Sequence, residues 1–230
     1  MPIGRDQPPG RSKQLPRGRH GLPRSVVVEN QRGRIFEALA SVCAAKGYAE
    51  VTVRDITDHA GVSRHTFYDL FSDKEQCFLA TYDVVVHRLL DRVSAAYYSG
   101  DRSWPARISA AVRALVQLCA ADPNLARLTM VEVLSAGPQA LACRDAALRR
   151  FAVFFEPGRA ALPGQMESQQ LLAQGVIGGL YEALYSQILD GQTERLAELL
   201  PDLVYCLLVP YLGHAPALAA SEAERLRDDL

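Results

Sequence analysis

Side chains between residues 63 and 68 have the types and spacing that recognition of duplex DNA requires. The guanidinium group of Arg64 can donate two hydrogen bonds at once to O6 and N7 of a guanine, a pairing worth ~1–3 kcal/mol of discrimination between bases. Thr66 could meet a thymine methyl group or a phosphate, and His65 and Tyr68 lie close to it along a helix. The alternative for Arg64 is a phosphate contact, which adds affinity without reading sequence.

Two short helices joined by a turn would present these side chains. Thr52 and Asp55 have the spacing of a capping box, which satisfies the free N–H groups at the start of a helix. Gly61 suits the left-handed backbone that ends a helix, and Ser63 is the expected cap of a second helix over Arg64–Phe71. This pattern predicts a helix-turn-helix, whose second helix enters the major groove of DNA.

Longer helices are expected on both sides of this motif. Residues 25–46 place apolar side chains at helical spacing, and Gly47 ends the pattern. Ser72 and Glu75 form a second box, which predicts a long helix from there to about Tyr98. The helix over residues 25–46 would supply the third wall of a small three-helix domain.

The composition is that of a soluble globular protein. The chain has 230 residues, of which 49% are hydrophobic and 22% charged, and no strand pattern occurs, so we expect an all-α fold. The net charge of −1 argues against a protein that coats nucleic acid over its whole surface, but the charge is uneven. Eight Arg or Lys residues fall between Met1 and Arg34, against only Asp6 and Glu29.

The first 24 residues are predicted to form a disordered basic arm. They are rich in Pro, Gly and Arg, with too few large apolar side chains to offset the entropy of ordering. The arm is either a solvated tail, which adds some affinity for DNA without a defined site, or a segment that reaches along the backbone or into the minor groove.

The cysteines and the hydropathy indicate a cytoplasmic protein. The cysteines are scattered and in apolar helical contexts, so we expect buried thiols in a reducing compartment, with a redox-sensing pair as the alternative. They are five in number: Cys43, Cys77, Cys119, Cys143 and Cys206. No segment approaches the ~18 apolar residues of a membrane span, and no apolar region follows the basic N-terminus as in a secretory signal.

Several helices should follow the motif. One is expected over residues 104–121, and Asp122 with Pro123 should start another, apolar nearly all round, that runs to Gly137. A third is expected over residues 138–155, ended by Pro157 and Gly158. Residues 163–164, Pro-Gly, indicate a loop.

Two strongly apolar helices, over residues 168–190 and 195–212, should close the fold, with Pro201 and Pro210 kinking or interrupting the second. Their apolar surface exceeds what one neighbouring helix covers, so we interpret them as a homodimer face, with an internal hairpin as the alternative. The residues expected at this interface are Gly175, Gly179, Leu203, Leu207 and Tyr211. Residues 215–230 are expected to be a polar tail.

A ligand pocket would draw on apolar side chains of the C-terminal half, although plain core packing is the alternative for each of them. The candidates are Trp104, Met130, Glu132, Phe151, Phe155, Tyr181 and Tyr185. Glu132 lies on an apolar stripe, where a carboxylate needs a partner. That partner would be a protein arginine such as Arg127 or Arg144, or else a cationic ligand.

No catalytic, cofactor or metal motif is present. H-E-x-x-H, G-x-S-x-G, the P-loop and G-x-G-x-x-G are all absent, and the histidines have no ligand spacing. An enzyme is therefore not expected. A purely structural helical bundle would leave the helix-turn-helix unexplained.

The motif resembles that of the TetR (tetracycline-repressor) family of bacterial transcription regulators. The matching residues are Thr52-Val53-Arg54-Asp55-Ile56, Ala60-Gly61-Val62-Ser63, Thr66-Phe67-Tyr68, Phe71 and Lys74-Glu75. The resemblance implies an all-α homodimer with a DNA-binding domain, here residues 25–77, and a helical domain for effector binding and dimerisation, here residues 78–214. It implies a repressor that binds a palindromic double-stranded DNA operator and responds to a small-molecule effector, which we expect to be largely apolar. The alternative is an activator, or a regulator controlled by a partner protein.

The resemblance also assigns roles to single residues. Tyr68 and Lys74 match positions that hold the DNA backbone on one flank, and Thr52 and Arg54 do so on the other. With Ser63, Arg64, His65 and Thr66 they complete the expected DNA-binding set. Two positions depart from the family pattern. Leu70 stands where a polar residue is common, and Asp69 would repel a phosphate unless it meets a cytosine amino group or pairs with an arginine.

Overall fold

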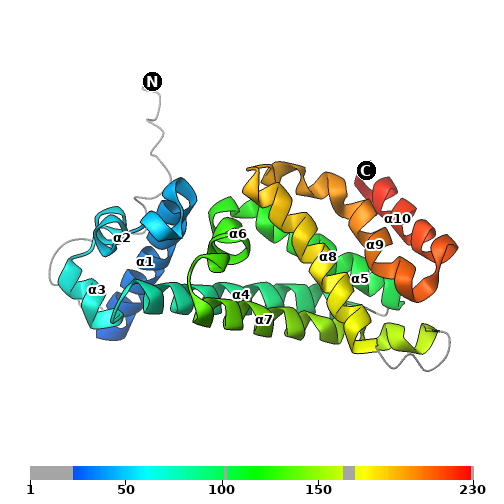
Figure 1. The fold of residues 1–230 in the computed structure, drawn as a ribbon, viewed down its shortest axis with the longest axis horizontal. Helices are drawn as coiled ribbons and strands as arrows, with labels where there is room; N and C mark the ends of the chain where they lie inside the picture. Colours follow the sequence, from blue (N-terminus) through cyan, green and yellow to red (C-terminus); the bar gives the residue numbers. More distant parts are fainter. Residues whose placement is uncertain (1–22, 101–102, 163–168, 229–230) are drawn as a thin grey trace, which may run out of the picture.

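The computed structural model describes residues 23–100, 103–162 and 169–228, and all regular structure in these ranges is helical. The molecule is elongated, with α3 at one end and α10 at the other (Figure 1). None of the helices in these ranges is long and apolar enough to cross a membrane. The proposed basic arm lies almost wholly in residues 1–22, outside the described ranges.

A small three-helix unit forms one end of the molecule. It consists of α1 (Arg24–Lys46), the 3₁₀ turn η1 (Tyr48–Glu50), α2 (Val53–Ala60) and α3 (Arg64–Leu70). Helix α3 ends one residue earlier than the sequence pattern suggested. The turn η1 was not predicted, but the order and the other boundaries follow the prediction, because local caps at Thr52, Gly61 and Ser63 set the bounds of α2 and the start of α3.

The predicted caps of α2 and α3 are confirmed. The hydroxyl of Thr52 accepts from the backbone N–H of Asp55, and the Asp55 carboxylate accepts from the N–H of Thr52 at 2.8 Å. Gly61 ends α2 in the left-handed region, with φ of 61°. The Ser63 hydroxyl accepts from the N–H of Thr66 at 2.9 Å. Side-chain acceptors at these positions satisfy N–H groups that no helical carbonyl can reach.

The cap of α4 (Lys74–Tyr98) is Asp73, so the predicted box of Ser72 and Glu75 is wrong by one residue. The Asp73 carboxylate accepts from the N–H of Gln76 at 2.7 Å, and the Gln76 side chain accepts from the N–H of Ser72 at 2.6 Å. The Ser72 hydroxyl donates to Asp73, because a charged carboxylate is the stronger acceptor.

The middle helices begin as predicted, but α6 ends earlier than expected. Helix α5 (Trp104–Ala121) matches its prediction, and α6 (Pro123–Met130) is capped by Asp122. The helix expected to reach Gly137 ends instead at Met130. A 3₁₀ turn, η2 (Glu132–Leu134), follows it. The change of winding places Glu132 against the small domain, so a tertiary contact overrides the local apolar pattern.

Helix α7 (Pro138–Ala152) passes into a 3₁₀ segment, η3 (Val153–Ala161), and thus stops before the predicted Phe155. Pro157 explains the change, because its ring would clash with the carbonyl of residue 153 in a continued α-helix. The expected end at Pro157 and Gly158 is also wrong, since the 3₁₀ segment runs through both. The predicted loop at residues 163–164 lies outside the described ranges.

The closing helices are α8 (Gln169–Leu189) and α9 (Leu200–Leu212), separated by the 3₁₀ segment η4 (Thr193–Leu199). The expected single helix from Arg195 is therefore divided. Pro201 lies in the first turn of α9, where a missing N–H costs little, so this proline marks a start rather than a kink.

The expected polar tail is wrong, because residues 214–228 form a further helix, α10 (His214–Asp228), packed on α9 and α5. Ala217, Ser221 and Glu224 are buried on its inner side. The Glu224 carboxylate accepts from Arg113 of α5 and, at 3.0 Å, from Arg227. The inward positions recur at i, i+4 and i+7, which is the spacing of one face of a helix, but two of the three side chains are polar.

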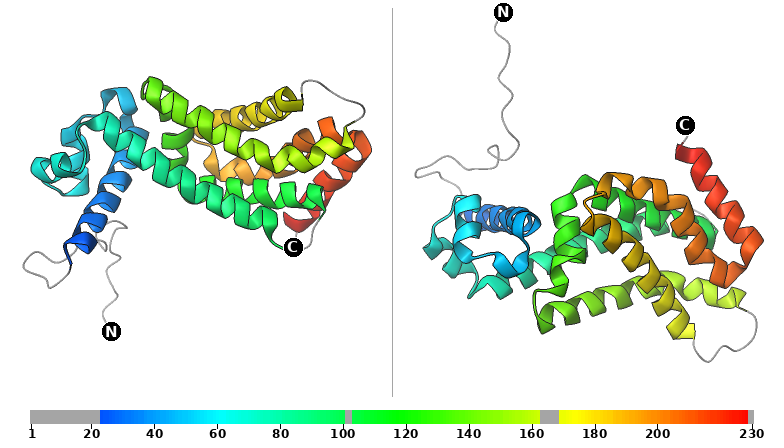
Figure 2. Two further views of the ribbon diagram at one scale, coloured as in Figure 1. Left: turned by 90° about the horizontal axis from the view of Figure 1, so that it is seen from below. Right: turned by 45° about the horizontal axis from the view of Figure 1, so that its top comes forward.

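Two hydrophobic clusters form the interior, and α4 contributes to both. Phe78 and Tyr82 pack in the cluster of the small domain, while Val93 and Tyr97 pack in the cluster of the C-terminal helices. Helix α7 runs alongside α4, and α8 packs on α7 (Figure 2). The predicted boundary between residues 77 and 78 falls inside a continuous helix, and the domain division remains a prediction.

Candidate nucleic-acid interface and ligand cavity

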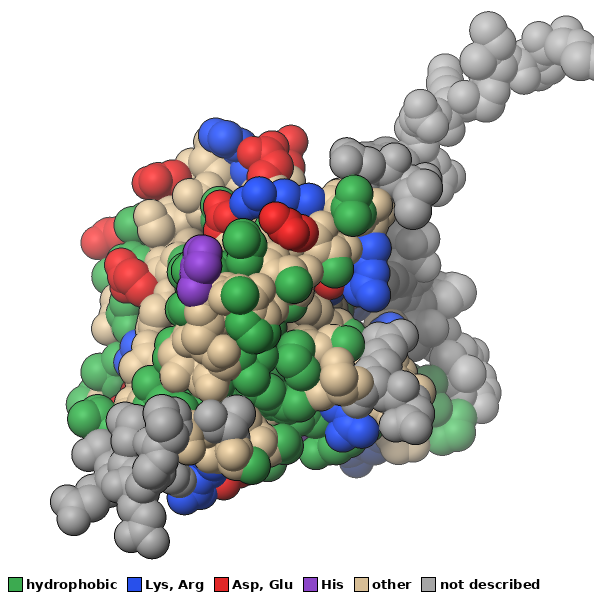
Figure 3. Space-filling model, turned by 90° about the vertical axis from the view of Figure 1, so that its right-hand side faces the viewer, with side chains coloured by type: hydrophobic (Ala, Val, Ile, Leu, Met, Phe, Trp, Pro, Cys, Tyr) green, Lys and Arg blue, Asp and Glu red, His purple; other side chains and the backbone are tan. Residues whose placement is uncertain are grey.

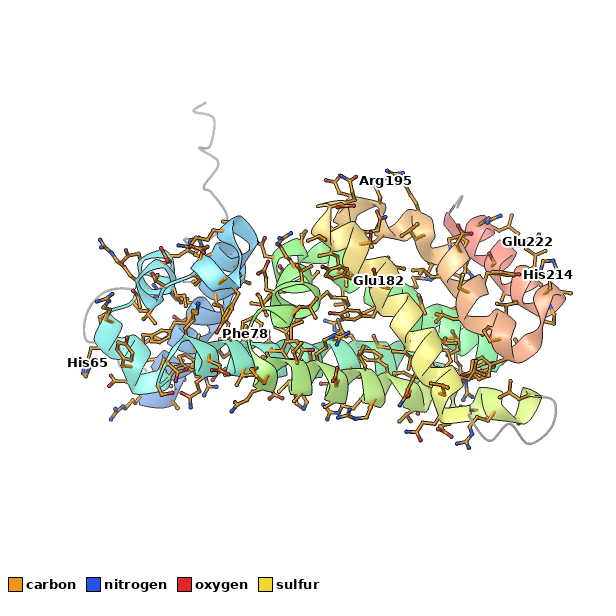
Figure 4. All side chains as sticks on the ribbon, viewed as in Figure 1. His65, Phe78, Glu182, Arg195, His214 and Glu222 are labelled. Atoms are coloured by element: carbon orange, nitrogen blue, oxygen red, sulfur yellow. The ribbon has the colours of Figure 1, made fainter. Side chains whose placement is uncertain are left out.

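Helix α3 exposes polar side chains on one face and packs aromatic side chains into the small domain on the other. Phe67 is fully buried, and its ring centroid lies 5.5 Å from that of Phe71. Arg64 and His65 are exposed, and 56% of the Tyr68 surface is exposed. Figure 4 shows His65 at the outer end of the molecule. Packing of the aromatic side therefore fixes the orientation of the predicted DNA-contacting side.

An arginine that the sequence analysis did not single out holds the turn between α2 and α3. Arg34 of α1 donates to the carbonyl groups of Ala60 and Gly61, the latter at 2.9 Å. These carbonyls are at the end of α2, where no helical N–H reaches them. The contact spans 26 residues, so no local sequence signal would reveal it.

Lys74 is directed into the small domain, which differs from its expected contact with the DNA backbone. Its ammonium donates to the carbonyls of Tyr48 and Val51, each at 2.8 Å, and lies 4.1 Å from the centroid of the Tyr48 ring. Two of its three N–H donors are therefore engaged within the chain. Its role in this structure is to fix η1 against the start of α4.

Asp69 and Arg54 pair with residues of their own helices, whereas Arg64 does not. Asp69, which the family pattern leaves unexplained, lies 3.6 Å from His65 one turn earlier in α3, rather than beside an arginine. Arg54 lies 3.4 Å from Asp58, with both side chains largely exposed. Arg64 has no hydrogen-bond or ionic partner in the described ranges. Its guanidinium is thus available to an external acceptor.

The acidic residue of the α2 capping box is strongly held in its charged form. Hydrogen bonds from Lys46, at 2.7 Å, and from Thr52 lower the pKa of Asp55 well below its usual value. The carboxylate therefore stays ionised at neutral pH, and Lys46 ties the end of α1 to the start of α2.

An apolar cavity lies among α4, α5, α7 and α8 and has a volume of about 60 Å³. Four of the predicted pocket residues line it, namely Met130, Phe151, Phe155 and Tyr181. The Tyr181 hydroxyl donates to the Met130 carbonyl at 2.5 Å, so its polar atom is already satisfied. The cavity therefore offers a ligand almost only apolar contacts.

Two other predicted pocket residues do not line the cavity. The Trp104 indole donates to the carbonyl of Phe154 at 3.0 Å, and its ring covers Gly158 so closely that an added Cβ there would clash. Tyr185 stacks on Tyr181, with 6.3 Å between the ring centroids, and is not among the residues that line the cavity. Trp104 packs against the core cluster of the C-terminal helices, whereas Tyr185 is half-buried and outside both clusters.

Glu132 also lies outside the cavity, and its partner is a protein arginine, as the sequence favoured. Its carboxylate accepts from Nε of Arg127 at 3.0 Å and from the backbone N–H of Tyr48 at 2.7 Å. Arg127 also donates to the carbonyl of Leu189 at the end of α8, at 3.3 Å. Glu132 is only 4% exposed, so its bond to Tyr48 is buried, and through the partly exposed Arg127 these bonds connect α8 to the small domain. Its assignment to the ligand pocket is corrected.

An open apolar groove of about 610 Å³ runs between α8 and α9. It is lined by four of the residues expected at the dimer face, namely Gly175, Gly179, Leu203 and Leu207. Tyr211 is instead buried within the chain, 5.9 Å from the ring of Phe155 and 5.3 Å from that of Trp104. Hydrophobic side chains also gather in a band on the neighbouring end of the molecule, where α9 and α10 meet (Figure 3).

The cysteines divide into two groups. Three are buried, and burial raises the pKa of each thiol to about 12, namely Cys43, Cys77 and Cys119. Cys143 and Cys206 are exposed, so the expectation that every cysteine is buried is wrong for these two. In the described ranges, no group of three His, Cys, Asp or Glu side chains could hold a metal ion.

The comparisons with known proteins agree with this arrangement. Residues 35–81 match the model of the bacterial regulatory proteins of the tetR family. The fatty acid degradation regulator FadR from Bacillus halodurans is similar in structure, with a TM-score of 0.69, 20% identity, and coverage of 77% of this chain and 94% of that chain. FadR from Bacillus subtilis in complex with stearoyl-CoA gives a TM-score of 0.68 at 18% identity, with coverage of 77% and 98%.

A gamma-butyrolactone receptor, an ArpA-like protein, is also similar, with a TM-score of 0.63, 18% identity, and coverage of 87% of this chain and 99% of that chain. At these identities, the structural likeness establishes the fold. No curated protein matches the chain. The family match covers the helix-turn-helix, whose helices are bounded by the caps and anchored by buried aromatic side chains. The fold is shared with the similar structures along most of the chain. Residues 35–81 therefore form a DNA-binding domain of the tetR family of bacterial regulatory proteins, and the chain has the fold of the transcriptional regulators to which it is similar.

Proposed function

We propose that this regulator is a cytoplasmic, ligand-responsive repressor that binds a palindromic operator as a homodimer, and that its role is regulatory rather than catalytic. The observation that carries the proposal is the two-sided α3 helix, with Phe67 buried and Arg64 free of any partner in the described ranges. In a helix-turn-helix, base contacts come from the N-terminal end of the second helix, which is where Arg64 lies.

The DNA-binding set then divides by role. Arg64 reads a guanine, Thr66 lies beside it, and Ser63 caps the helix that carries both. Exposed side chains on the two flanks contact phosphates, namely Thr52, Arg54, His65 and Tyr68. Lys74 supports the interface from within the domain. A phosphate contact by Arg64 is the competing arrangement, and the two differ in how a substitution changes specificity.

Footprinting of the full chain on the DNA upstream of its own gene tests the DNA-binding part. We expect protection of an inverted repeat. Arg64→Ala should weaken operator binding roughly 5- to 150-fold, since a bidentate base contact is worth ~1–3 kcal/mol, and should leave nonspecific binding almost unchanged. The matched control is Arg195→Ala, because Arg195 is also exposed and lies far from α3 (Figure 4).

Two results would contradict this assignment. A shift that depends on salt but not on sequence would refute operator recognition by the chain. An equal loss for all DNA sequences in Arg64→Ala, with the salt slope reduced by about one, would make Arg64 a phosphate contact.

The groove between α8 and α9 supports the dimer part of the proposal. A Cβ built on Gly175, Gly178 or Gly179 meets nothing within 4 Å, so the glycines of α8 make no close packing contact within the described chain. Each costs ~0.8–1.0 kcal/mol relative to alanine in mid-helix. Such a glycine-lined apolar surface is suited to contact with a second copy of the chain. In the resulting dimer bound to DNA, the α3 helices of the two copies would lie about 34–36 Å apart.

Sedimentation equilibrium tests the dimer. Cys206 is exposed in the single chain but lines the groove, so Cys206→Glu should disrupt the dimer without disturbing the fold. Cys143→Glu is the matched control, because Cys143 is exposed on α7, outside this groove. A monomeric wild-type chain, or a Cys206→Glu dimer as tight as the control, would refute this interface.

The cavity supports the ligand-responsive part. Drug-sized ligands occupy roughly 300–1,000 Å³. The cavity holds only about 60 Å³, so a bound effector requires the surrounding helices to move apart. A ligand changes DNA binding only if it has different affinities for two such states. The FadR complex with stearoyl-CoA shows that a chain of this fold binds a ligand with a long apolar part.

Melting curves against a panel of apolar metabolites test this part, because a ligand that binds the folded state raises the melting temperature by mass action. The effector should raise the melting temperature and also release the operator in the footprint. A ligand that stabilises the protein without changing operator occupancy is not an effector. Transcription from the operator in vitro then gives the sign of regulation.

A further inference from the structure

Arg144 is a cation on the inner side of α7, at the edge of the apolar cavity. Leu148 and Phe151 follow it at i+4 and i+7, and both line the cavity. The Arg144 guanidinium lies over the ring of Tyr181, another lining residue, with 4.4 Å between Cζ and the ring centroid. The charged group is thus separated from the cavity by one aromatic ring.

The hydrogen bonding of this guanidinium is incomplete. Nη1 lies 3.1 Å from the carboxylate of Asp145, the next residue along the helix, whose side chain is 53% exposed. Nε is buried and has no acceptor, and within the described ranges it is the only buried side-chain nitrogen or oxygen atom in this state. Buried polar groups are nearly always paired, so an unpaired charged donor indicates an acceptor from outside the chain.

The protein acid that could have completed the bonding is engaged elsewhere. Glu132 is bonded to Arg127 and to the backbone of Tyr48, and it leaves Arg144 without a buried carboxylate partner. The Tyr181 hydroxyl donates to Met130, and its oxygen interacts with the Arg144 guanidinium without satisfying Nε, so that donor stays unpaired. The result is a donor of fixed positive charge beside a space lined by apolar side chains.

We propose that this site binds an amphiphile with an anionic head and an apolar tail, with the head on Arg144 at the contact of α7 and α8 and the tail in the cavity. The inference rests on the proposed effector cavity and names the chemical class of its ligand. A guanidinium suits carboxylate and phosphate heads alike, because both offer charged oxygen acceptors. Insertion of the tail displaces the cavity wall, and the head binds where the buried Nε of Arg144 has no acceptor.

Calorimetric titration of the full chain with decanoate, decyl phosphate and 1-decanol separates head from tail, because all three share one tail. At least one anion should bind roughly 10- to 100-fold more tightly than the alcohol, the gain expected of charge-assisted hydrogen bonds. The tighter anion identifies the head as carboxylate or phosphate. Arg144→Met should bring the ratio of anion to alcohol affinity close to one, while Arg144→Lys should keep part of the preference.

The matched control is Arg149→Met, on the same helix with an exposed side chain, which should keep the wild-type ratio. Because each ratio is measured within one variant, a general loss of stability does not imitate the result, and melting curves confirm that each variant is folded. Equal binding of the alcohol and both anions would overturn the inference, as would an unchanged ratio in Arg144→Met.

The operator footprint distinguishes this inference from the proposed function. If an anion binds through Arg144 but leaves operator occupancy unchanged, the ligand site stands and the ligand-responsive role fails. If decanol binds as well as the anions and releases the operator, the ligand-responsive role stands and the role of Arg144 is refuted.

Discussion

Replacing Glu132 by glutamine tests whether its buried carboxylate joins the two parts of the molecule. Glu132 is 4% exposed and accepts from Arg127 and from the N–H of Tyr48. Hydrogen bonds to a charged group contribute ~1.5–3 kcal/mol each, and removing one partner of a buried ion pair costs ~3–5 kcal/mol. A glutamine oxygen still accepts one bond, and the Arg127 side chain is 27% exposed, which reduces the cost.

These terms give a loss of about 2–3 kcal/mol in the free energy of unfolding. For a chain of this size, ~1 kcal/mol corresponds to a shift of roughly 2–4 °C, so Glu132→Gln should melt about 5–10 °C below wild type. Circular dichroism during heating measures the shift. Glu194→Gln is the matched control, because Glu194 is exposed and outside this network.

A double-mutant cycle with Arg127→Met then separates the ion pair from the bond to Tyr48. We expect a coupling energy of roughly 0.5–3 kcal/mol between the two sites, since the residues are in direct contact. Melting of Glu132→Gln within about 1 °C of Glu194→Gln would refute the reasoning, because that difference is well below ~1 kcal/mol for a chain of this size.

Three further outcomes are expected. Because hydrogen bonds lower the pKa of Asp55 in the folded state, the stabilisation is fully present above the unfolded value of 3.8 and is lost as the pH falls toward the lowered pKa. Urea unfolding between about pH 3 and 6 should therefore show a weaker acid dependence in Asp55→Asn than in wild type. A thiol reagent at about pH 8 should label Cys143 quickly, Cys206 only as far as the dimer dissociates, and the three buried cysteines only after denaturation; rapid labelling of all five would contradict the fold. Deleting residues 214–230 should lower the melting temperature and promote aggregation, because it uncovers α9 and removes the acid that neutralises Arg113; unchanged melting would contradict the packing of α10.

The helix-turn-helix was predictable because its signals are local. The Thr52 box, the left-handed Gly61 and the Ser63 cap each act over three or four residues, and each is confirmed. The buried Phe67 follows from helical spacing alone. The family signature adds the expectation that α3 enters the major groove of DNA, which no single residue supplies.

Contacts between distant segments were not predictable in the same way. Lys74 has the charge expected of a phosphate contact. Only the fold shows that its ammonium group donates to carbonyl groups 23 and 26 residues earlier in the chain. The early end of α6 follows from the bond between Glu132 and Tyr48, 84 residues apart. The α10 helix was missed because its three inward positions are small or polar, so hydropathy gives little signal there.

The small size of the apolar cavity has a mechanical consequence. Empty space lined by apolar side chains is volume that pressure can remove, so the cavity makes this part of the core compressible. A tail that fills the space replaces compressible volume with close contacts between α4, α5, α7 and α8. Ligand binding would thereby stiffen the region through which α4 reaches the DNA-binding domain, and pressure should oppose the expanded state whenever no ligand fills it.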